Sequence, residues 1–432
     1  MDSFWRYLYN IIGVPFLYAG FSLAALANAK VRRGIEGRKN LFSNLEREMS
    51  RLPKKGPRFW IHSSSMGEFE QAKPLVKELK RKFPDGSVVV SFFSPSAFDH
   101  VQGYKEADCL CYLPFDSIRG AEQFLSVVQP DVAIVVRHDL WPNHLWQLKK
   151  HNIPAVLINC SAHPVSYYKF FSLLQFDRSV YSVFDLILTV SQEAKIFCRK
   201  YNLGKGRIEV VGDTRYDQVV ARAKQAEEIV SPLRKLKGNR KCFVLGSTWP
   251  SDEEVLFEAL SKLYSNGIEV WIVLVPHEPT EEHLFQIEQQ LSKIGVRSNR
   301  FSKVGTNKVE SSEVLIVDKV GILASLYALG EVSFVGGGFG PGVHSVLEPA
   351  ALGKVVIFGP KHKNSYEAGL LKKRGVGFVV NNSDELYNLF SSFLKDQKFV
   401  DEKGKMAARF VQENLGATER IVSCLKNMVH SS

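Results

Sequence analysis

Short apolar runs alternate with longer amphipathic stretches along most of the chain, between about residue 59 and residue 380. The apolar runs are rich in β-branched residues, which predicts strands buried on both faces, and helix-length segments separate them, which is typical of parallel sheets with crossover helices. The predicted strands are Phe59–His62, Val88–Phe92, Val132–Val136, Ala155–Asn159, Leu186–Val190 and Ile208–Val211, then Phe243–Gly246, Val270–Val275, Val314–Val317, Val332–Val335, Val355–Phe358 and Gly377–Val380.

The two series of strands are separated by a charged, uneven stretch over residues 221–238, which we interpret as a linker. A chain of 432 residues is too long for one ordinary core and suits two domains of about 200 residues each. We therefore predict an α/β protein with two Rossmann-like domains that face a cleft. The expected domains are residues 40–220 and 221–432, preceded by a separate N-terminal segment over residues 1–39.

The N-terminal segment carries no charge between Arg6 and Lys30 and is long enough to cross a bilayer. A basic flank follows it, and the positive-inside rule then places the rest of the chain in the cytoplasm. The flanking residues are Lys30, Arg32, Arg33, Arg38 and Lys39. We expect an anchor in the inner membrane, with the two domains on its cytoplasmic face.

Two other interpretations of this segment stay open. Ala27-Asn28-Ala29 fits the small-residue pattern of a cleaved signal peptide, although the basic flank behind it favours retention. Pro15 and Gly20 favour a helix that lies in the membrane interface and does not span it.

The net charge of +11 indicates anionic surroundings, such as a membrane surface or phosphorylated substrates. No zinc-finger spacing, RNA-binding aromatic motif or basic helical repeat occurs, so nucleic acid is not an expected partner. The six cysteines form no disulfide framework, and Cys109-x-Cys111 lacks the second pair of a zinc site. We predict no metal site and no cofactor.

A glycine-rich loop over residues 336–342 lies between two predicted strands. Bare glycines let backbone N–H groups approach a ligand, and a helix that starts near His344 or Ser345 would direct its positive end at an anion. Glu348 then lies in the first helical turn, where a carboxylate can accept from ribose hydroxyls. The loop predicts a nucleotide-linked donor, and the alternative is a tight strand-to-helix turn without a ligand.

Polar residues follow several other predicted strands, where the loops of a parallel sheet converge. The segment from Ser63 to Glu68 follows the first strand, and a carboxylate at the mouth of a cleft can take a proton from a hydroxyl. We predict Glu68 as a general base. The alternative is a capping box, with Ser65 as the N-cap of the next helix and Glu68 reaching back to it.

These motifs together resemble those of 3-deoxy-D-manno-octulosonic acid (Kdo) transferases, glycosyltransferases of the GT-B class that use a cytidine-monophosphate sugar. The resemblance covers essentially the whole chain. His62, Ser65, Gly67 and Glu68 match a segment whose Glu is the family's base, and Leu140-Trp141-Pro142-Asn143 is also typical. Gly212-Asp213-Thr214-Arg215 resembles a segment with a cation that stabilises the transition state.

The resemblance implies catalytic roles for Glu68, Asp139 and Arg215, and for Arg215 the alternative is a surface salt bridge with Asp213 or Asp217. It also implies a CMP-binding set in the second domain. That set is Ser247, Thr248, Pro276, His277, Gly321, Ile322, Leu323, His344, Ser345, Val346, Leu347, Glu348, Pro349 and Asn364.

The chain departs from the family pattern where acceptor contacts are expected. Arg137-His138-Asp139 stands where the family has Glu-x-Glu, which reverses one charge and shortens one carboxylate, and Asn159-Cys160-Ser161 replaces Asn-Ala-Arg. His277 and Ile322 also replace an Arg and a Glu around the cytidine. The donor type is therefore better supported than the acceptor.

The resemblance implies an inverting, metal-independent transfer of Kdo from CMP-Kdo to a lipid A precursor in lipopolysaccharide biosynthesis, at the inner leaflet of the membrane. Two alternatives remain: a GT-B enzyme with another nucleotide sugar or acceptor, and a non-catalytic membrane-tethered nucleotide-binding protein.

Overall fold

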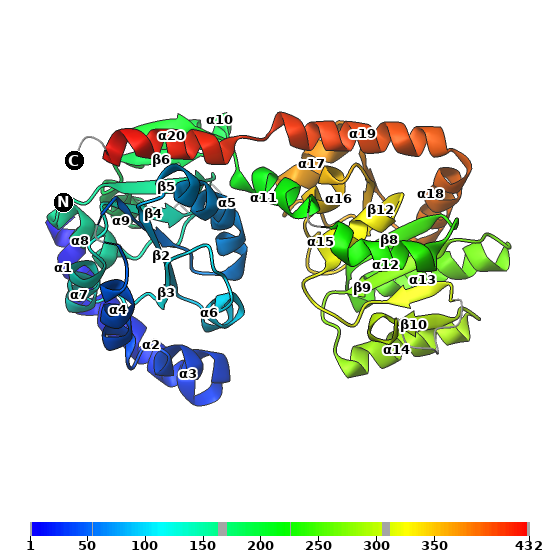
Figure 1. The fold of residues 1–432 in the computed structure, drawn as a ribbon, viewed down its shortest axis with the longest axis horizontal. Coiled ribbons are helices and arrows are strands. Elements are labelled where there is room, and N and C mark those ends of the chain that lie inside the picture. Colours follow the sequence, from blue (N-terminus) through cyan, green and yellow to red (C-terminus); the bar gives the residue numbers. More distant parts are fainter. Residues whose placement is uncertain (1, 54, 163–170, 225, 305–311, 430–432) are drawn as a thin grey trace. The chain divides into compact units, whose positions relative to one another are not determined.

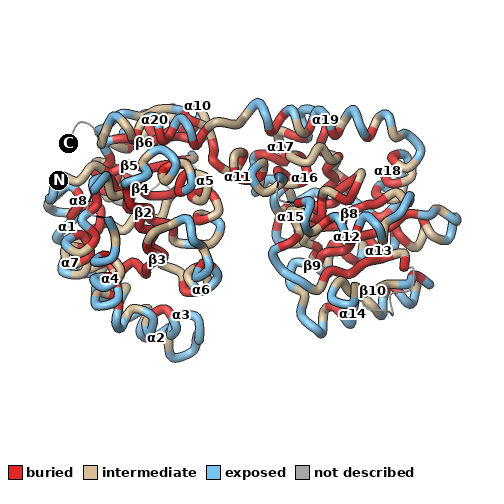
Figure 2. Tube along the Cα trace, in the orientation of Figure 1, coloured by how far each residue is buried: buried red, intermediate tan, exposed pale blue. Residues whose placement is uncertain are grey.

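The computed structural model describes residues 2–53, 55–162, 171–224, 226–304 and 312–429. The chain forms two compact units, each with its own core (Figures 1 and 2). Unit 1 comprises Met1–Gln218 and Leu415–Ser432, and unit 2 comprises Val219–Asn414. The C-terminal residues were expected in the second domain, but the chain returns to unit 1 after Asn414.

Unit 1 contains a seven-stranded parallel sheet in the order β3-β2-β1-β4-β5-β6-β7. Its inner strands are buried throughout because both faces are covered by helices, which accounts for their unbroken apolar sequence. The strands are β1 (Arg58–His62), β2 (Ser87–Phe92), β3 (Cys109–Tyr112), β4 (Val132–Val136), β5 (Ala155–Cys160), β6 (Leu186–Thr189) and β7 (Arg207–Val210).

In unit 1, α4 (Leu41–Ser50) precedes the first strand, and the other helices fill the crossovers between strands. These are α5 (Met66–Lys82), α6 (Pro95–Val101), α7 (Ile118–Val128), α8 (Pro142–Lys150), α9 (Phe171–Tyr181) and α10 (Gln192–Lys200). The C-terminal helix α20 (Ala417–Val429) packs on α5, and its Ile421, Val422 and Leu425 complete the core on that face. Asp217 fixes its start by accepting from the amides of Gly416 and Thr418.

Unit 2 repeats the architecture with a parallel sheet in the order β10-β11-β9-β8-β12-β13-β14. Its strands are β8 (Cys242–Thr248), β9 (Trp271–Pro276), β10 (Ser298–Arg300), β11 (Val314–Ile316), β12 (Val332–Val335), β13 (Val355–Phe358) and β14 (Gly377–Val379). Its helices are α12 (Glu227–Lys237), α13 (Pro250–Ser265), α14 (Glu281–Lys293), α15 (Leu323–Leu326), α16 (Leu347–Ala351), α17 (Tyr366–Lys373), α18 (Ser383–Lys395) and α19 (Gln397–Glu413), and α11 (Thr214–Ala223) crosses the boundary between the units.

The strand order reverses between β1 and β4 in unit 1, and between β8 and β12 in unit 2. In open parallel sheets such a reversal leaves a crevice at the carboxyl ends of the two strands, where ligands bind. Glu68 lies at the start of the helix after β1 and Asp139 in the loop after β4, whereas Thr248 ends β8 and His344 lies in the loop after β12. The predicted Rossmann-like fold is confirmed for both units.

The N-terminal residues form α1 (Asp2–Leu8), a π-helical turn over Tyr9–Gly13, α2 (Val14–Ala27) and α3 (Ala29–Glu36). Phe4–Ala27 is long and apolar enough to cross a membrane by length and composition. One side of it nevertheless packs on unit 1. The Tyr9 hydroxyl donates to Asp116 at 2.7 Å, and the Phe21 ring lies 5.3 Å from that of Phe115.

The opposite side of the same helix is exposed and apolar. Its exposed residues are Phe4, Tyr7, Ile11, Ile12, Phe16, Leu23 and Leu26. The helix therefore combines contacts with unit 1 on one side with an exposed apolar surface on the other.

Several predicted boundaries differ in the structure. Strands β3 and β10 were not predicted, because β3 is only Cys109–Tyr112 and β10 is polar Ser298–Arg300 at a sheet edge. The predicted linker over residues 221–238 contains the end of α11 and all of α12, whose Val230 and Leu233 are buried among charged neighbours. The helix after the glycine loop starts at Leu347 and not near His344 or Ser345.

Candidate active site

Glu68 lies in the first turn of α5, directly after the loop that follows β1, and its side chain is half-buried. One carboxylate oxygen accepts from the Ser64 amide at 2.7 Å, the Ser64 hydroxyl at 2.8 Å and the Ser65 amide at 3.3 Å. The Ser65 hydroxyl in turn accepts from the Glu68 amide. The capping box weighed from the sequence is thus present, and it holds the carboxylate in one orientation.

Asp139, in the loop after β4, is the partner of His62 at the end of β1. Nε2 of the buried His62 lies 2.8 Å from Oδ2 of Asp139, and its Nδ1 lies 2.9 Å from the Ser91 hydroxyl. Trp141 Nε1 also donates to Asp139 at 2.9 Å. Burial acts to raise the pKa of Asp139, but hydrogen bonds from His62 and Trp141, together with the charge of His62, outweigh it, so the pKa is lowered.

Glu68 and Asp139 thus follow the two strands at the reversal of unit 1, and each is held by its own hydrogen bonds. A half-buried carboxylate in a fixed orientation suits proton transfer from a hydroxyl that reaches its second oxygen.

The other motif residues of this loop make contacts that hold the loop in place. The buried Asn143 donates its side-chain amide to the carbonyl of Asp116 and its backbone amide to the Asp116 carboxylate. The Trp141 ring stacks on Phe93 with centroids 4.3 Å apart. Arg137 adopts a left-handed φ of 63°, and His138 Nε2 lies 2.9 Å from the Ser161 hydroxyl.

Arg215 lies in the first turn of α11, and its guanidinium is paired with Asp213. Its Nε and Nη2 donate to Oδ2 of Asp213 at 2.9 and 2.7 Å, as in the salt-bridge alternative. The neighbouring Thr214 hydroxyl donates to the carbonyl of Gln71 on α5 at 2.7 Å. The loop that carries Arg215 is thereby fastened to the helix that carries Glu68.

In unit 2 the glycine loop is held by Asp252 on α13, a side chain that is fully buried. Its carboxylate accepts from the amides of Gly337 at 2.7 Å, Phe339 at 3.0 Å and Trp249 at 2.9 Å. Several other loop amides donate to carbonyls within the protein. The loop is therefore chiefly a tight turn, and the expectation that its own N–H groups reach a phosphate is wrong for Gly337 and Phe339.

Close packing explains why this loop is glycine-rich. A Cβ on Gly336 would lie 2.2 Å from the carbonyl oxygen of Ser247, and one on Gly338 would lie 2.4 Å from the amide of Gly359. Beyond the loop, and within the part of the chain that the structure describes, the amides of Ser345, Val346 and Leu347 have no acceptor in the protein. These amides are the ones available to an anion.

An aromatic stack lies at the carboxyl ends of β8, β9 and β12. The Trp249 and His344 rings are coplanar with centroids 6.3 Å apart, and the His277 ring stacks against both, with centroids 4.6 and 4.4 Å away. Trp249 Nε1 donates to His344 Nε2 at 2.8 Å, so the neutral imidazole carries its proton on Nδ1. Burial, followed by the positive charge of His277, lowers the pKa of His344.

The other predicted donor residues surround the stack or the loop. The Thr248 hydroxyl donates to the buried Glu253, whose second oxygen lies 2.9 Å from His283 Nε2. Thr248, Trp249, His277 and His283 line a pocket of about 270 Å³. In this unit Ser247 has a left-handed φ of 53°, and Pro276 ends β9. Asn364 donates to the carbonyl of Val343, and Glu348 pairs with Arg222. Gly321 and Ile322 precede Leu323, where α15 starts.

Sequence reasoning missed Asp252, Trp249 and His283. A sequence signal existed for Asp252, which stands three residues after Trp249 at the start of a helix, the spacing of a capping box. Nothing in the sequence shows that the same carboxylate reaches the glycine loop.

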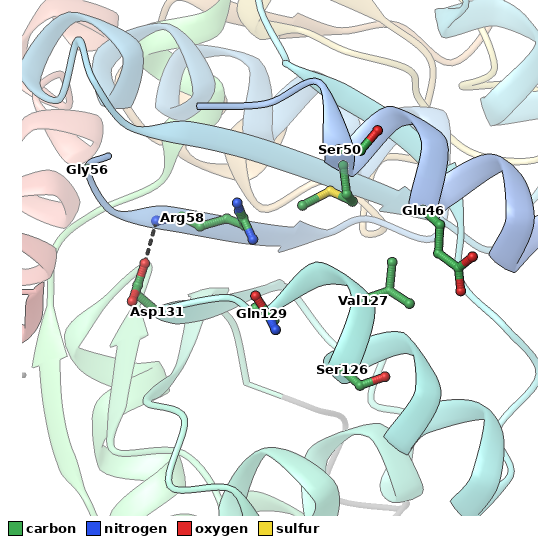
Figure 3. Close-up of a pocket in the computed structure, with 9 residues that line it drawn as sticks. Glu46, Ser50, Gly56, Arg58, Ser126, Val127, Gln129 and Asp131 are labelled. Atoms are coloured by element: carbon green, nitrogen blue, oxygen red, sulfur yellow. Dashed lines mark hydrogen bonds between the residues drawn. The ribbon is translucent and has the colours of Figure 1, made fainter. Parts of the chain in front are cut away.

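A larger pocket of about 710 Å³ lies at the opposite edge of the unit 1 sheet (Figure 3). Its lining includes Arg58 at the start of β1 and Asp131 before β4, so it is at the amino ends of the strands. The Asp131 carboxylate accepts from the Arg58 amide at 2.6 Å, and the Arg58 guanidinium donates to the carbonyl of Val128. These polar groups join the strand starts and form no catalytic cluster.

Comparisons with known proteins show which family the chain resembles. Residues 39–218 match the family described as 3-deoxy-D-manno-octulosonic-acid transferase (kdotransferase). The 3-deoxy-D-manno-octulosonic acid transferase of Haemophilus influenzae is 26% identical over 435 residues, 98% of each chain. That of Aquifex aeolicus is 29% identical over 351 residues, 80% of this chain and 89% of its own.

Solved structures with a similar fold include a UDP-GlcNAc 2-epimerase from Neisseria meningitidis, with a TM-score of 0.63 at 14% identity over 86% of this chain and 100% of its own. A glycosyltransferase from Rickettsia africae has a TM-score of 0.58 at 14% identity over 87% and 99%. At such identity they establish the fold alone, two Rossmann-like units of the GT-B type.

Proposed function

Because the chain belongs to the family of 3-deoxy-D-manno-octulosonic acid (Kdo) transferases, we propose that it transfers Kdo from CMP-Kdo to a lipid A precursor in lipopolysaccharide biosynthesis. The observation that carries the proposal is the oriented carboxylate of Glu68, beside Asp139 at the strand reversal of unit 1. It is supported by similarity to a Kdo transferase along 98% of the chain.

Glu68 acts as the general base of an inverting displacement. It takes the proton of an acceptor hydroxyl as that oxygen bonds to the anomeric carbon of Kdo, and the bond from that carbon to the CMP phosphate breaks. His62 and Trp141 hold Asp139 ionised, and Asp139 orients the acceptor. Unit 1 is thus the acceptor domain.

Unit 2 binds the CMP part of the donor through the residues at the ends of β8, β9 and β12. The free amides of Ser345, Val346 and Leu347 face the phosphate, Thr248 and Asn364 fix the surrounding loops, and Glu348 accepts from the ribose. The nucleotide site is completed by Ser247, Pro276, His277, the Gly321–Leu323 segment, His344 and Pro349.

The charge that develops on the leaving phosphate is met by these amides. Arg215, whose planar guanidinium suits phosphate or carboxylate, is the cation proposed to stabilise the transition state. Transfer proceeds without a metal.

The N-terminal helix places unit 1 at the cytoplasmic face of the inner membrane, with the exposed apolar side of α1 and α2 in the leaflet. The exposed basic residues Lys30, Arg32 and Lys39 then lie near anionic headgroups. A phosphorylated glycolipid in that leaflet is the matching acceptor.

Incubation of the purified protein with CMP-Kdo, generated in situ, and a tetraacylated lipid A precursor tests the proposal. A product heavier by one or more Kdo units supports it, and an unchanged acceptor mass contradicts it. Parallel assays with uridine-diphosphate sugars separate this function from that of another enzyme with the same fold, such as an epimerase.

A further inference from the structure

A groove of about 200 Å³ lies between the N-terminal helices and the sheet of unit 1. The atoms that line it are almost wholly apolar. Its walls are formed by Phe21 of α2, by Val31, Gly34 and Ile35 of α3, and by Phe93, Pro95 and Phe115 on the sheet side. Lys30 and Arg38 lie at its rim.

The groove has a fixed frame. The Arg38 guanidinium donates to the carbonyls of Leu113, Gly34 and Phe93, at 2.7, 2.7 and 2.8 Å, and lies over the rings of Phe93 and Phe115. These bonds fasten α3 to the sheet. The groove is therefore built into unit 1 and does not depend on loose packing of a terminal helix.

The groove shares α2 with the apolar surface of the N-terminal helix. Phe21, which forms one wall, belongs to α2, whose exposed Phe16, Leu23 and Leu26 are the residues placed in the leaflet above. Lys30, exposed at the rim, suits an anionic headgroup that remains outside.

The groove also adjoins the candidate base. Phe93 stacks on Trp141, which donates to Asp139. The amide of Ser94, another lining residue, donates to the carbonyl of Ser64 at 2.9 Å, and Ser64 binds Glu68. One residue thus separates the groove from each of the two carboxylates.

We propose that this groove binds one acyl chain of the glycolipid acceptor and so positions the acceptor hydroxyl beside Glu68. The proposal rests on the proposed function and adds to it a recognition site for the lipid part of the substrate. Sugar and phosphate contacts alone would then not account for acceptor selection.

The first test uses a series of acceptors with acyl chains short enough to stay monomeric in water. For the wild type, kcat/KM should rise about fourfold with each added methylene, as expected for about 0.8 kcal/mol per buried group, until the groove is full. A Cβ on Gly34 would lie 3.4 Å from Pro95 Cγ, so Gly34→Leu fills part of the groove. The rise of kcat/KM with chain length should stop about four methylenes earlier in this variant than in the wild type, one for each carbon that Leu adds.

Gly20→Leu is the matched control, since Gly20 lies on the exposed part of α2 with no atom within 4 Å of an added Cβ. It adds the same apolar bulk outside the groove, and its chain-length series should follow the wild type. A wild-type series that is flat in chain length, or a Gly34→Leu series identical to the wild type, overturns the proposal.

The second test needs neither turnover nor a variant. An acceptor analogue with a photoreactive diazirine at the end of one chain should label the peptides that contain Val31–Arg38 and Phe93–Pro95 in the wild-type protein. Labelling confined to the outer face of α1 and α2 would overturn the proposal that the acyl chain binds in the groove. Labelling of the groove without Kdo transfer to any acceptor would instead contradict the proposed function and leave the lipid site standing.

Discussion

Ser64 donates both its amide and its hydroxyl to the same carboxylate oxygen of Glu68, at 2.7 and 2.8 Å. The second carboxylate oxygen is therefore the one that is open to an incoming hydroxyl. Because Glu68 also completes the capping box of α5, its structural and catalytic roles are combined in one side chain. They can be separated by substitution, since Gln satisfies a capping box but cannot accept a proton.

Glu68→Gln should lower kcat for transfer by about 10² to 10⁴-fold, the usual contribution of a general base, with the melting temperature unchanged. Glu68→Ala should lose the activity and also about 1 kcal/mol of stability, because the cap is broken. Steady-state kinetics and thermal unfolding of both variants check this.

A Glu68→Gln protein that transfers Kdo at the wild-type rate would show that Glu68 is only a cap. If neither the wild type nor Glu68→Gln transfers Kdo, the non-catalytic interpretation is favoured.

In Asp139→Asn the free energy of unfolding should fall less steeply with acid than in the wild type. Hydrogen bonds hold the pKa of Asp139 below its ordinary value of 3.8, so its contribution is complete above that value and is lost as pH falls through the folded pKa. Urea unfolding between about pH 5 and about pH 2 should show the difference between wild type and variant shrinking with acid.

Asp99→Asn is the control for this measurement, because Asp99 is about half exposed and has only a long ion pair with Arg33. A difference between wild type and Asp139→Asn that stays constant with pH would contradict the assigned direction of the pKa shift.

The sequence predicted the fold well because buried parallel strands are continuous apolar runs. The same logic fails for β10, whose Ser298–Arg300 are polar at a sheet edge, and for α12, where two buried residues are hidden among charges. Family motifs led to Glu68 and Asp139, but the hydrogen bonds that orient them join residues far apart in the chain. His62 and Asp139 are 77 positions apart, and local patterns carry no signal of such a contact.

The glycine loop shows the same limit in unit 2. Its composition suggested amides free for phosphate, whereas two of them bind Asp252, 85 and 87 positions earlier. The glycines at 336 and 338 are required by the close approach of neighbouring backbone. A sequence rich in glycine therefore predicts tight packing as readily as ligand contact, and only the fold decides between them.

Asp252→Asn should destabilise unit 2 by about 3 kcal/mol or more, because an amide cannot accept from all three backbone N–H groups and brings donors against them. It should also weaken CMP binding, since the loop that precedes Ser345 loses its support. Denaturant unfolding and calorimetric titration with CMP measure the two effects. Asp384→Asn, at a side chain 75% exposed, should change stability by no more than about 0.5 kcal/mol.

Treatment with a chelator should leave Kdo transfer unchanged, as expected when amides meet the charge on the leaving phosphate and Arg215 stabilises the transition state. The assay is the mass shift of the acceptor with and without EDTA, after removal of divalent ions from all substrates. Loss of activity that is restored by adding back one divalent cation would contradict metal independence. A loss that no cation restores would indicate an effect of EDTA on the donor-generating system, which purified CMP-Kdo avoids.

His277→Gln should raise the pKa of His344. Burial is the larger cause of the lowered pKa and the charge of the stacked His277 is the second, so removing that charge leaves the pKa still below 6.5. NMR titration of the His344 ring protons measures the change, and His100→Gln, a distant exposed position, should leave it unaltered. The shift matters for donor binding because the Trp249 indole N–H needs an unprotonated Nε2 on His344 as its acceptor. A pKa that does not move would mean that His277 acts through ring packing alone, and the stack would then be a rigid platform without electrostatic coupling.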